Sequence, residues 1–533
     1  MANHERRTAA RYAYRRSPDQ DSARPVRHPV IVVGAGPVGL TAALDLALRN
    51  VPVVLLDDSD RIGEGSRGIC YAKRSLEIWD RLGVGERLRD MGVTWKLGKV
   101  FLGDALVFAF DLLPEEGHKM PAFINLQQYR LEEVLIERAG EIPGIDLRWR
   151  NRVVGLVQGN EGVRLTVETP EGPYSLEADW VVAADGARST LRSLLELSFS
   201  GVSFEDKFLI ADVRMAADLP TERRFWFSPT FHSGESALMH RQPDNVWRID
   251  LHLGPDADPA EERRPERVVA RLERMLEGRA FSLEWISVYT FLCRRLERFV
   301  HGRVVFAGDA AHQVSPFGAR GGNSGVQDAE NLAWKLAAVL KGEADFRLIE
   351  SYDTERIQAA DENIAHSARA TEFIAPRSEG CRILRNAVLS LAPTAEFARR
   401  MVNSGRLSTP TVYDTPLSTP DEDAFSGTAR LGAPAPDAPL STPSGEGGFL
   451  LERLSQGFTL LFVDGEGEPP PPQGAAVRVI NRDLLDESGV FCRRYDATPG
   501  SAYLLRPDQH LCARWRRPDA DKVAAAMRRA LGR

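Results

Sequence analysis

The sequence predicts an α/β protein with a strand–helix–strand domain, a second and mostly antiparallel sheet inserted into it, and a small α/β unit towards the C-terminus. Three observations indicate this organisation. A strand, a glycine turn, a helix and a second strand follow one another within residues 29–58. Short buried strands return much later, at 180–184 and 303–307. Between these returns the pattern changes to longer alternating strands, which are typical of antiparallel sheets.

Composition and charge exclude several classes of protein. Hydrophobic residues make up 43% and charged residues 27% of the 533 residues, and no apolar run approaches the ~18 residues of a membrane span. The net charge of −7 provides no basic face for nucleic acid. The five cysteines contain no C-x-x-C pair and are typical of reduced thiols. We therefore expect a cytoplasmic protein that acts on small molecules, with no membrane and no nucleic-acid partner.

Residues 1–27 predict a disordered arm. Several arginines occur there without an apolar stretch, so the segment is not a secretory signal. Acidic residues interrupt its positive charge, which also disfavours a targeting peptide.

The first unit has the pattern of a dinucleotide site, because the strand Val30–Val33 leads into the sequence GAGPVG. In this pattern Gly34 permits a tight turn, Gly36 lets backbone N–H groups approach a pyrophosphate, and Gly39 lets the helix pack closely on the strand. Phosphates then lie at a helix N-terminus, where unpaired N–H groups and the dipole favour anions. The expected contacts are Gly34, Gly36, Pro37 and Gly39.

A carboxylate completes the pattern. The second strand, Val53–Leu56, ends at Asp57, close to the spacing of about 20 residues at which an acidic side chain binds the ribose hydroxyls of adenosine. Asp57 is therefore the expected ribose ligand.

The chain then returns to this site. The elements expected in the first part of the nucleotide domain, residues 28–198, are helices at 73–82 and 126–139 separated by irregular sequence, and strands at 153–157, 163–168 and 180–184. The last strand ends at Asp185-Gly186. Residues 199–299 form the inserted sheet, and residues 300–404 return to the first domain through a strand that ends at Gly308-Asp309. A long helix follows, with Asn323 or Ser324 as its expected N-cap.

Residues 405–447 are rich in Pro, Ser, Thr, Asp and Gly, and predict a linker to a separate unit at 448–533. In that unit the pattern predicts strands at 458–463, 475–480 and 502–505 and a helix from about Asp519.

Three separated pieces thus indicate one ligand: the glycine turn with Asp57, the D-G-x-x-S-x-x-R pattern at Asp185–Arg192, and the G-D-A-A-H pattern at Gly308–His312. This set, in this order and spacing, resembles the class A flavoprotein monooxygenases, the aromatic hydroxylases related to phenol hydroxylase and 3-(3-hydroxyphenyl)propionate hydroxylase. The resemblance covers about residues 28–400. It implies a Rossmann-like FAD-binding domain, FAD as the cofactor and NADH or NADPH as the co-substrate.

The resemblance also assigns cofactor contacts. The segment 316–325 looks like the one that passes under the flavin ring, with Pro316, Gly321, Gly322 and Asn323 beside it. A helix N-terminus there would stabilise negative charge on the reduced ring. Ala319-Arg320 replaces the Gly-Gln that is frequent in the family, so the role of Arg320 stays open. Further implied contacts are Asp185, Gly308, Asp309, which would bind the ribityl chain, Arg67 and Gln128.

The implied reaction is reduction of FAD by NAD(P)H, reaction with O₂ to a C4a-hydroperoxide, and oxygen transfer to a small, electron-rich aromatic substrate with water excluded. A base or donor must activate the phenol. Candidates from the inserted sheet are His240, Arg241, Tyr289, Arg294 and Arg295, and the carbonyl of Pro316 is another. The aromatic residues Phe225, Trp226, Phe227 and Phe231 could line the substrate cavity or belong to the core.

Alternatives stay open at this point. A second G-x-G-x-x-G at 63–68 lacks a strand leading into it, so we interpret it as a loop beside the cofactor. Without a second nicotinamide domain, Baeyer–Villiger enzymes and disulfide reductases are disfavoured. Polyketide hydroxylation, oxidative removal of a ring substituent, and a flavin-binding scaffold without turnover remain alternatives to phenol hydroxylation.

The C-terminal unit resembles the thioredoxin-like domain appended to phenol hydroxylase relatives, on the sequences at 431–437 and 505–508. Because it lacks C-x-x-C, redox work is not expected there. Contact between subunits, as in a homodimer, or stabilisation is the expected role.

Overall fold

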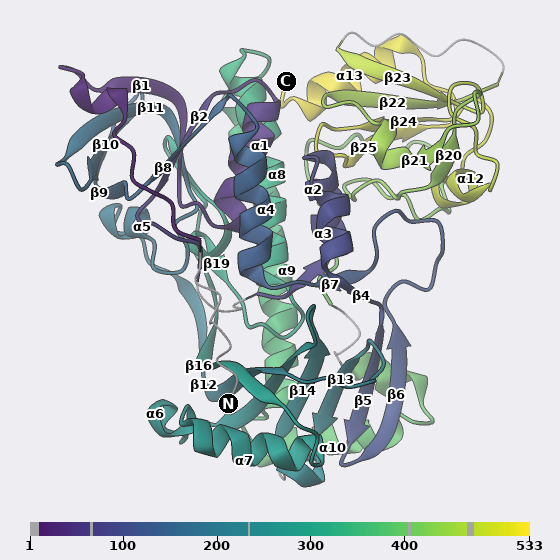
Figure 1. Ribbon diagram of the computed structural model, residues 1–533. Coiled ribbons are helices and arrows are strands. Elements are labelled where there is room, and N and C mark those ends of the chain that lie inside the picture. The colour runs from purple at the N-terminus through teal and green to yellow at the C-terminus, as the bar shows by residue number, and fades with distance from the viewer. Residues whose placement is uncertain (1–9, 64–67, 233–234, 403–406, 466–473) are drawn as a thin grey trace.

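The structure is a computed structural model and describes residues 10–63, 68–232, 235–402, 407–465 and 474–533. Figure 1 shows a first sheet at the upper left, a second sheet below it and the C-terminal unit at the upper right. Helices α8 (Gly321–Leu340) and α9 (Arg347–Ile374) run through the centre of the molecule. The first sheet, the second sheet and the C-terminal unit each pack against one or both of these helices.

The first sheet has a parallel core in the order β18–β11–β1–β2–β8, with β17, β10 and β9 paired antiparallel around it. Its strands are β1 (Val26–Val33), β2 (Val53–Asp57), β8 (Ile145–Trp149), β9 (Arg152–Gln158), β10 (Val163–Glu168), β11 (Tyr174–Ala183), β17 (Val300–His301) and β18 (Val304–Phe306). The runs of Val, Ile and Leu in its central strands are buried, as expected for parallel strands covered on both faces. The expected strands at 153–157, 163–168 and 180–184 are confirmed.

Helices α1 (Pro37–Leu48), α4 (Gln128–Gly140) and α8 pack beside this sheet and share its core. Smaller helices are α2 (Lys73–Arg81), α3 (Gly85–Met91) and α5 (Thr190–Leu194). The helices expected at 73–82 and 126–139 therefore correspond to α2 and α4.

The disordered arm expected at 1–27 is wrong for residues 10–27, which lie against the first domain. Tyr12 stacks on Trp149 with 4.4 Å between ring centroids. Asp19, in a short 3₁₀ helix, accepts hydrogen bonds from Arg148 at 2.6 Å and pairs with His28 at 2.9 Å. The side chains of Tyr12 and Asp19, in the segment expected to be disordered, thus have buried partners in the first domain. Residues 1–9 lie outside the described residues.

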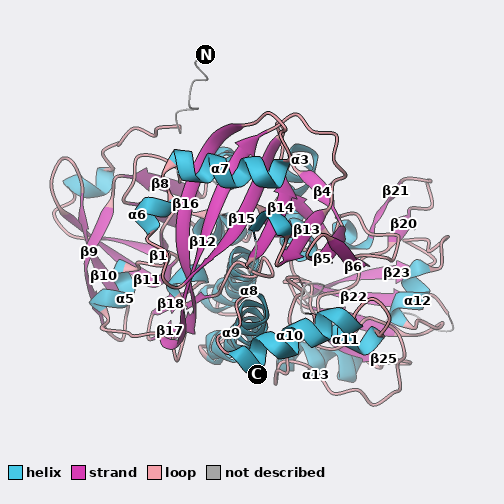
Figure 2. Ribbon diagram, turned by 90° about the horizontal axis from the view of Figure 1, so that it is seen from below, coloured by secondary structure: helices cyan, strands magenta, loops and turns pink. Residues whose placement is uncertain are grey.

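The second sheet has the order β19–β16–β12–β15–β14–β13–β5–β6, and its described pairings are antiparallel except the β13–β5 pair. Its strands are β5 (Leu97–Leu102), β6 (Ala105–Asp111), β12 (Ser200–Arg214), β13 (Arg223–Phe227), β14 (Ser236–Arg241), β15 (Val246–Gly254), β16 (Ser282–Arg295) and β19 (His312–Gln313). Helix α7 (Pro265–Leu276), preceded by α6 (Pro259–Glu262), covers its outer face (Figure 2). Its inner face packs on α9, α10 (Glu379–Leu391) and α11 (Glu396–Met401).

This sheet extends beyond residues 199–299, because β5 and β6 come from the sequence that was expected to be irregular. The ring of Phe110 on β6 lies over Gly98 on β5, where a Cβ atom would approach Phe110 Cζ to 2.1 Å. The same region contributes β4 (Val93–Trp95) and β7 (Phe123–Asn125), and β7 pairs with both β4 and β3 (Cys70–Ala72) in a small third sheet.

The C-terminal unit is a four-stranded sheet in the order β23–β22–β24–β25. Its elements are β20 (Pro439–Ser441), β21 (Gly447–Phe449), β22 (Phe458–Val463), β23 (Ala475–Ile480), β24 (Ala502–Leu505), β25 (Leu511–Trp515), α12 (Val490–Tyr495) and α13 (Ala520–Ala530). The three expected strands and the terminal helix are confirmed.

The linker expected at 405–447 is packed structure where it is described. Tyr413 is 4% exposed, stacks on His510 with 4.9 Å between centroids, and accepts a hydrogen bond from Arg356 at 2.7 Å. Trp334 of α8 and Leu417 share one core cluster with β22, β24 and β25. The C-terminal unit therefore shares a core with the first domain. The expectation of a linker that leads to a separate unit is wrong.

Candidate active site

The glycine turn between β1 and α1 shows which glycines the chain needs for its own packing. Gly34 has φ +104°, and a Cβ atom there would lie 2.4 Å from the carbonyl oxygen of Ala184. A Cβ atom at Gly39 would lie 1.9 Å from the carbonyl oxygen of Gly34. Gly36 differs, because a Cβ atom there would meet no atom within 4 Å. Gly36 also caps the N-terminus of α1, whose first residue is Pro37, so the open space lies where unpaired N–H groups favour a phosphate.

Asp57 ends β2 beside this turn. Its Oδ2 accepts a hydrogen bond from the N–H of Ala35 at 2.7 Å, and its Oδ1 accepts one from Ser59 at 2.9 Å. Burial raises the pKa of Asp57, and the two backbone N–H groups oppose that effect. The carboxylate is thus fixed against the turn, and each oxygen keeps a second lone pair for a further donor such as a ribose hydroxyl.

Asp185 follows β11, which lies next to β1 in parallel, so it emerges at the same sheet edge as Gly34. Its Oδ2 accepts a hydrogen bond from Leu191 N–H at 3.0 Å, and the Ser189 hydroxyl accepts one from Arg192 N–H at 3.0 Å. Among the described residues, Asp185 Oδ1 is buried without a hydrogen-bond partner. Gly186, with φ +75°, has open space where a side chain would project. A polar atom and a cradle for a ligand therefore lie side by side.

Gly308 and Asp309 follow β18, the next strand of the sheet. Gly308 has φ +61° and packs on Val38 of α1, where a Cβ atom would approach Val38 Cγ2 to 2.9 Å. The N–H of Gly308 donates to Asp328 Oδ2 at 2.9 Å, and Asp328 also binds His312 at 2.6 Å. Burial acts to raise the pKa of Asp328, but His312 and the nearby Arg356 outweigh it and hold that pKa well below its usual value. This buried cluster fixes the turn that presents the exposed Asp309.

Helix α8 begins at Gly321 with Arg320 as its N-cap, so the N-cap expected at Asn323 or Ser324 is wrong. Asn323 instead joins α8 to β3 and α2: its Oδ1 accepts from Ala72 N–H at 2.8 Å and from the Ser75 hydroxyl at 2.7 Å, and its Nδ2 donates to Cys70 O at 2.9 Å. The side chain of Arg320 is 3% exposed and donates to Asn363 of α9 at 2.9 Å.

The other cofactor contacts expected in this region are Gly321, Gly322, Gln128 and Arg67. A Cβ atom at Gly322 would meet nothing within 4 Å, and one at Gly321 would contact only Val314, at 3.4 Å. Gln128 accepts a hydrogen bond from Gly68 N–H at 3.0 Å and so holds Gly68 against the start of α4. Arg67 lies outside the described residues.

These features fit a dinucleotide cofactor of the FAD type. An open helix N-terminus, a fixed carboxylate at the next strand end, and Asp185, with its unpaired buried oxygen beside the open Gly186, lie at one edge of the sheet, and the open Gly322 lies in the first turn of α8. A ligand bound there would meet donors and acceptors along its whole length.

A narrow apolar pocket lies between the inner face of the second sheet, α9 and the segment that leads into α8. It is lined by Arg223, Phe225, Phe227, Phe317, Gly318, Ala370, Phe373, Ile374, Val402 and Leu407. Phe317 and Gly318 belong to the segment that leads into α8. Aromatic walls with a single charged side chain suit a planar ring that carries a polar group.

A family model described as an FAD binding domain matches residues 27–367. The chain belongs to the class A flavin-dependent monooxygenases. This monooxygenase is 31% identical to the 12-dehydrotetracycline 5-monooxygenase/anhydrotetracycline 6-monooxygenase of Streptomyces rimosus, over 91% of this chain and 95% of the relative. It is 30% identical to the para-nitrophenol 4-monooxygenase of a Pseudomonas species, over 61% of this chain and 82% of the relative.

The fold of this monooxygenase is similar to the crystal structure of the flavin-dependent monooxygenase PieE in complex with FAD and substrate. The TM-score is 0.81 at 22% sequence identity, and the match covers 96% of this chain and 100% of the other. Among the described residues, no helix has both the length and the apolar content needed to cross a bilayer.

The catalytic candidates of the monooxygenase occupy different places. His240 is 5% exposed on β14, and burial, with Arg223 and Arg248 nearby, holds its pKa well below the usual value. Tyr289 on β16 packs against the aromatic cluster of the pocket. Arg294 donates to Gln313 at 2.8 Å at the sheet edge.

The other catalytic candidates, Pro316, Arg295 and Arg241, also have contacts within the protein. The carbonyl of Pro316 accepts a hydrogen bond from Ala319 N–H at 3.0 Å in a turn, Arg295 pairs with Asp361, and Arg241 lies over the Trp247 ring of the outer-face core. Of the predicted aromatic residues, Phe225 and Phe227 line the pocket, whereas Trp226 and Phe231 pack on the outer face beside α7.

Sequence reasoning missed Arg223, the charged residue of the pocket, and its neighbour Asp250. The alternation of β13, in which Arg223, Phe225 and Phe227 share one face, could have indicated Arg223.

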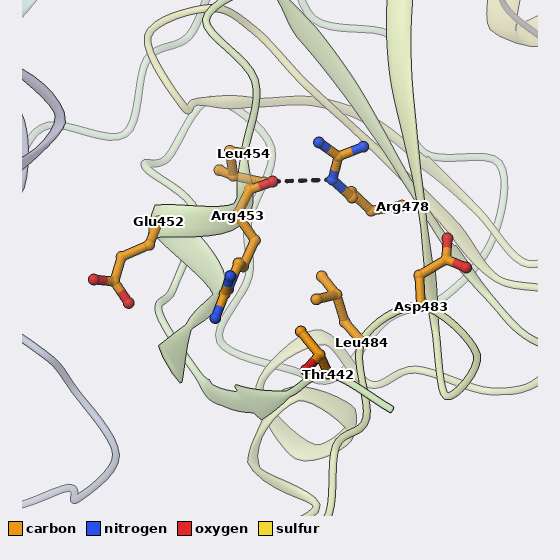
Figure 3. A pocket seen from close by; sticks show the side chains of 7 residues that line it. All are labelled: Thr442, Glu452, Arg453, Leu454, Arg478, Asp483 and Leu484. Carbon is orange, nitrogen blue, oxygen red and sulfur yellow. Dashed lines mark hydrogen bonds between the residues drawn. The ribbon is translucent and has the colours of Figure 1, made fainter. Parts of the chain in front are cut away.

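An open cavity also lies in the C-terminal unit (Figure 3). It is lined by Thr442, Glu452, Arg453, Leu454, Arg478, Asp483 and Leu484, and Arg478 Nε donates to the Arg453 carbonyl at 3.1 Å. None of its lining residues lines the apolar pocket described above or belongs to the three cofactor motifs.

Proposed function

We propose that this protein uses NADH or NADPH and O₂ to hydroxylate a phenolic or hydroxylated heteroaromatic compound. One observation carries the proposal: the pocket that contains Arg223 among aromatic side chains is continuous with Phe317 and Gly318, which lead into the N-terminus of α8. A ring held there would lie beside the segment expected under the flavin. Its oxygen substituent would be close to a guanidinium group that favours negative charge.

The cofactor contacts in this proposal follow the sheet edge. The N-terminus of α1 at Gly36 would hold the pyrophosphate, Asp57 the adenosine ribose, and Asp185 and Asp309 the ribityl side. Backbone at Gly308, Gly321 and Gly322, with Gln128 and Arg67, would complete the site. FAD, when bound, supplies hydride acceptance from NADH or NADPH and activation of O₂.

The chain's own groups then have defined tasks. The backbone N–H groups at the start of α8 would stabilise negative charge at the pyrimidine end of the ring. Because the side-chain amide of Asn323 already holds β3 and α2, the backbone N–H of Asn323 would face the cofactor instead. The Phe225, Phe227 and Phe317 side chains would exclude water, which protects a reactive oxygen species from loss as hydrogen peroxide.

A second candidate function is hydroxylation of a multi-ring polyketide. The tetracycline relative aligns with 91% of this chain and therefore reaches into the C-terminal unit, whereas the nitrophenol relative aligns with 61%. A thioredoxin-like fold for the C-terminal unit, without redox work, belongs to this proposal and is supported by its central four-stranded sheet and terminal helix.

The test is a screen on purified, FAD-loaded protein. NADH and NADPH oxidation and O₂ consumption are followed with single-ring phenols and with multi-ring hydroxylated polyketides, and products are identified by mass. A product with one added oxygen from a phenol supports the first candidate, and one from the polyketides alone supports the second. Bound flavin that neither nicotinamide reduces would instead indicate a scaffold without turnover.

A further inference from the structure

A row of buried charged side chains crosses the inner face of the second sheet. Asp212 on β12 lies opposite Arg248 on β15, and Arg248 lies opposite His240 on β14. Arg223 extends the same face on β13, and Asp250 lies two residues after Arg248. Two carboxylates and two guanidinium groups therefore share the wall that faces the pocket.

This row is connected to the expected flavin position by hydrogen bonds. The Arg241 carbonyl, next to His240, accepts from Asn125 Nδ2 at 2.7 Å, and Asn125 Oδ1 accepts from the Cys70 thiol at 3.1 Å. The Cys70 carbonyl in turn accepts from Asn323 in the first turn of α8. The charged row and the N-terminus of α8 therefore lie on the two sides of one interface.

The two carboxylates of the row have different surroundings. Asp212 is neutralised by Arg248, which donates from Nε at 2.9 Å and from Nη2 at 3.0 Å, and Gln242 adds a hydrogen bond at 3.1 Å. Asp250 is partly exposed, yet its Oδ1 is buried and has no hydrogen-bond partner among the described residues. A buried carboxylate oxygen without a donor is unfavourable, so a donor from a bound molecule would stabilise it.

We propose that Asp250 accepts a hydrogen bond from a hydroxyl group of the aromatic substrate and thereby makes the ring electron-rich. The inference rests on the proposed function and assigns the activating group that the sequence left open. Asp250 pairs with Leu238, and Leu238 pairs with Phe225 of the pocket wall, so Asp250 lies two strands, about 10 Å, from the pocket along the sheet. A substrate with more than one ring can fill the pocket and also span this distance, so that its hydroxyl reaches Asp250 on β15.

The proton transfer involves only the substrate hydroxyl and Asp250, and it is balanced. The hydroxyl proton moves towards the Asp250 carboxylate, and the electron pair of the O–H bond stays on the substrate oxygen and is shared with the ring. Arg248 and Arg223 supply the positive charge that stabilises that oxygen. No additional oxidant or reductant is needed for this step.

The surrounding groups give the interaction a defined pH dependence. Burial raises the pKa of Asp250 to about 6, Asp212 adds to that effect, and Arg248 and Arg223 oppose it. The pKa of His240 is well below its usual value, and burial raises that of Cys70, on β3, to about 12, so neither changes charge near pH 6. Asp250 is therefore the group in this row that loses its acceptor charge as the pH falls through about 6.

The test measures binding to FAD-loaded protein, and not turnover. 1-Naphthol and its methyl ether, which lacks the hydroxyl donor, are titrated while the absorption of the bound flavin is recorded. We expect the wild-type protein to bind 1-naphthol about tenfold more tightly than the ether, the range of a hydrogen bond to a charged group. Asp250→Asn should remove this preference, and the matched control Glu284→Gln, on an exposed site of β16, should keep it.

A second measurement needs no variant: in the wild-type protein the preference for 1-naphthol should be lost as the pH is lowered from about 8 to about 5. The proposal is overturned if the wild-type protein shows no preference, if Asp250→Asn retains it, or if it is independent of pH. Failure of the proposed function has a different signature, because the protein would then bind FAD but oxidise no nicotinamide with any phenol or polyketide.

Discussion

Arg506 of the C-terminal unit donates two hydrogen bonds to Glu355 of α9, from Nη1 to Oε1 at 2.6 Å and from Nη2 to Oε2 at 3.1 Å. Both side chains are at most 2% exposed. Glu355 also pairs with Lys335 of α8 at 2.8 Å, and Arg506 pairs with Asp508, which accepts a hydrogen bond from Trp334 Nε1 at 3.0 Å. The C-terminal unit thus completes the charge balance of the two central helices.

Removing one partner of this pair should therefore destabilise the whole protein. Arg506→Ala leaves Glu355 buried with incomplete pairing, and the expected loss is about 3 to 5 kcal/mol of unfolding free energy. Urea unfolding followed by tryptophan fluorescence measures it. Lys522→Ala breaks the exposed pair with Glu422 and should leave the unfolding midpoint nearly unchanged. Equal midpoints for Arg506→Ala and wild type would show that the C-terminal unit is not needed for that balance.

The glycine turn offers a matched pair of variants. Gly39→Ala places a methyl group against the Gly34 carbonyl and should lower the melting temperature of the protein even without FAD. Gly36→Ala meets no protein atom within 4 Å and should leave that temperature unchanged, but should weaken FAD binding at least tenfold because the methyl group occupies the approach of the phosphates. Differential scanning fluorimetry and flavin titration separate the two effects. Tight FAD binding by Gly36→Ala would place the pyrophosphate elsewhere.

Asp309 provides a separate test of the cofactor site. Its side chain is exposed in the turn that the buried Asp328 holds through Gly308. Asp309→Ala should therefore fold with a melting temperature close to that of the wild-type protein, yet be purified largely without flavin. The absorbance ratio of flavin to protein after gel filtration measures this. Asp104→Ala, an exposed carboxylate on the far part of the second sheet, is the control that should retain flavin. Full flavin content in Asp309→Ala would contradict the ribityl assignment.

The sequence was sufficient wherever one short segment contains the whole signal. The strands that end at Asp57, Asp185 and Gly308 are local apolar runs followed by glycine or acid, so both their position and their common sheet edge could be predicted. The start of α8 was misplaced because asparagine is a residue type that favours the N-cap position. The actual hydrogen-bond partners of Asn323, Ala72 and Cys70, are distant in sequence.

Features that depend on pairing between distant segments could not be predicted. Strands β5 and β6 are half-exposed. The contact between Phe110 and Gly98 that accompanies their pairing cannot be recognised from the order of apolar and polar residues in the sequence. The alternation of β13 groups Arg223 with Phe225 and Phe227, but only the assembled sheet shows that this face is covered and that Asp250 on β15 shares it. The arm and the linker were misjudged for the same reason, since Tyr12 and Tyr413 find their partners far along the chain.

The second sheet should also make stability depend on pH. Burial lowers the pKa of His252, but Asp206, 2.9 Å from its Nε2, and Glu235 outweigh that effect and raise the pKa to about 9. Because this value is above the usual value of about 6.5 for an unfolded chain, the protonated pair stabilises the fold fully below pH 6.5, and the stabilisation is lost as the pH rises through about 9. The loss should reach about 1 to 3 kcal/mol, reduced by the partial exposure of Glu235. Urea unfolding of wild type and His252→Asn between about pH 6 and pH 10 measures it, and parallel curves for the two proteins would assign the pH dependence to other groups.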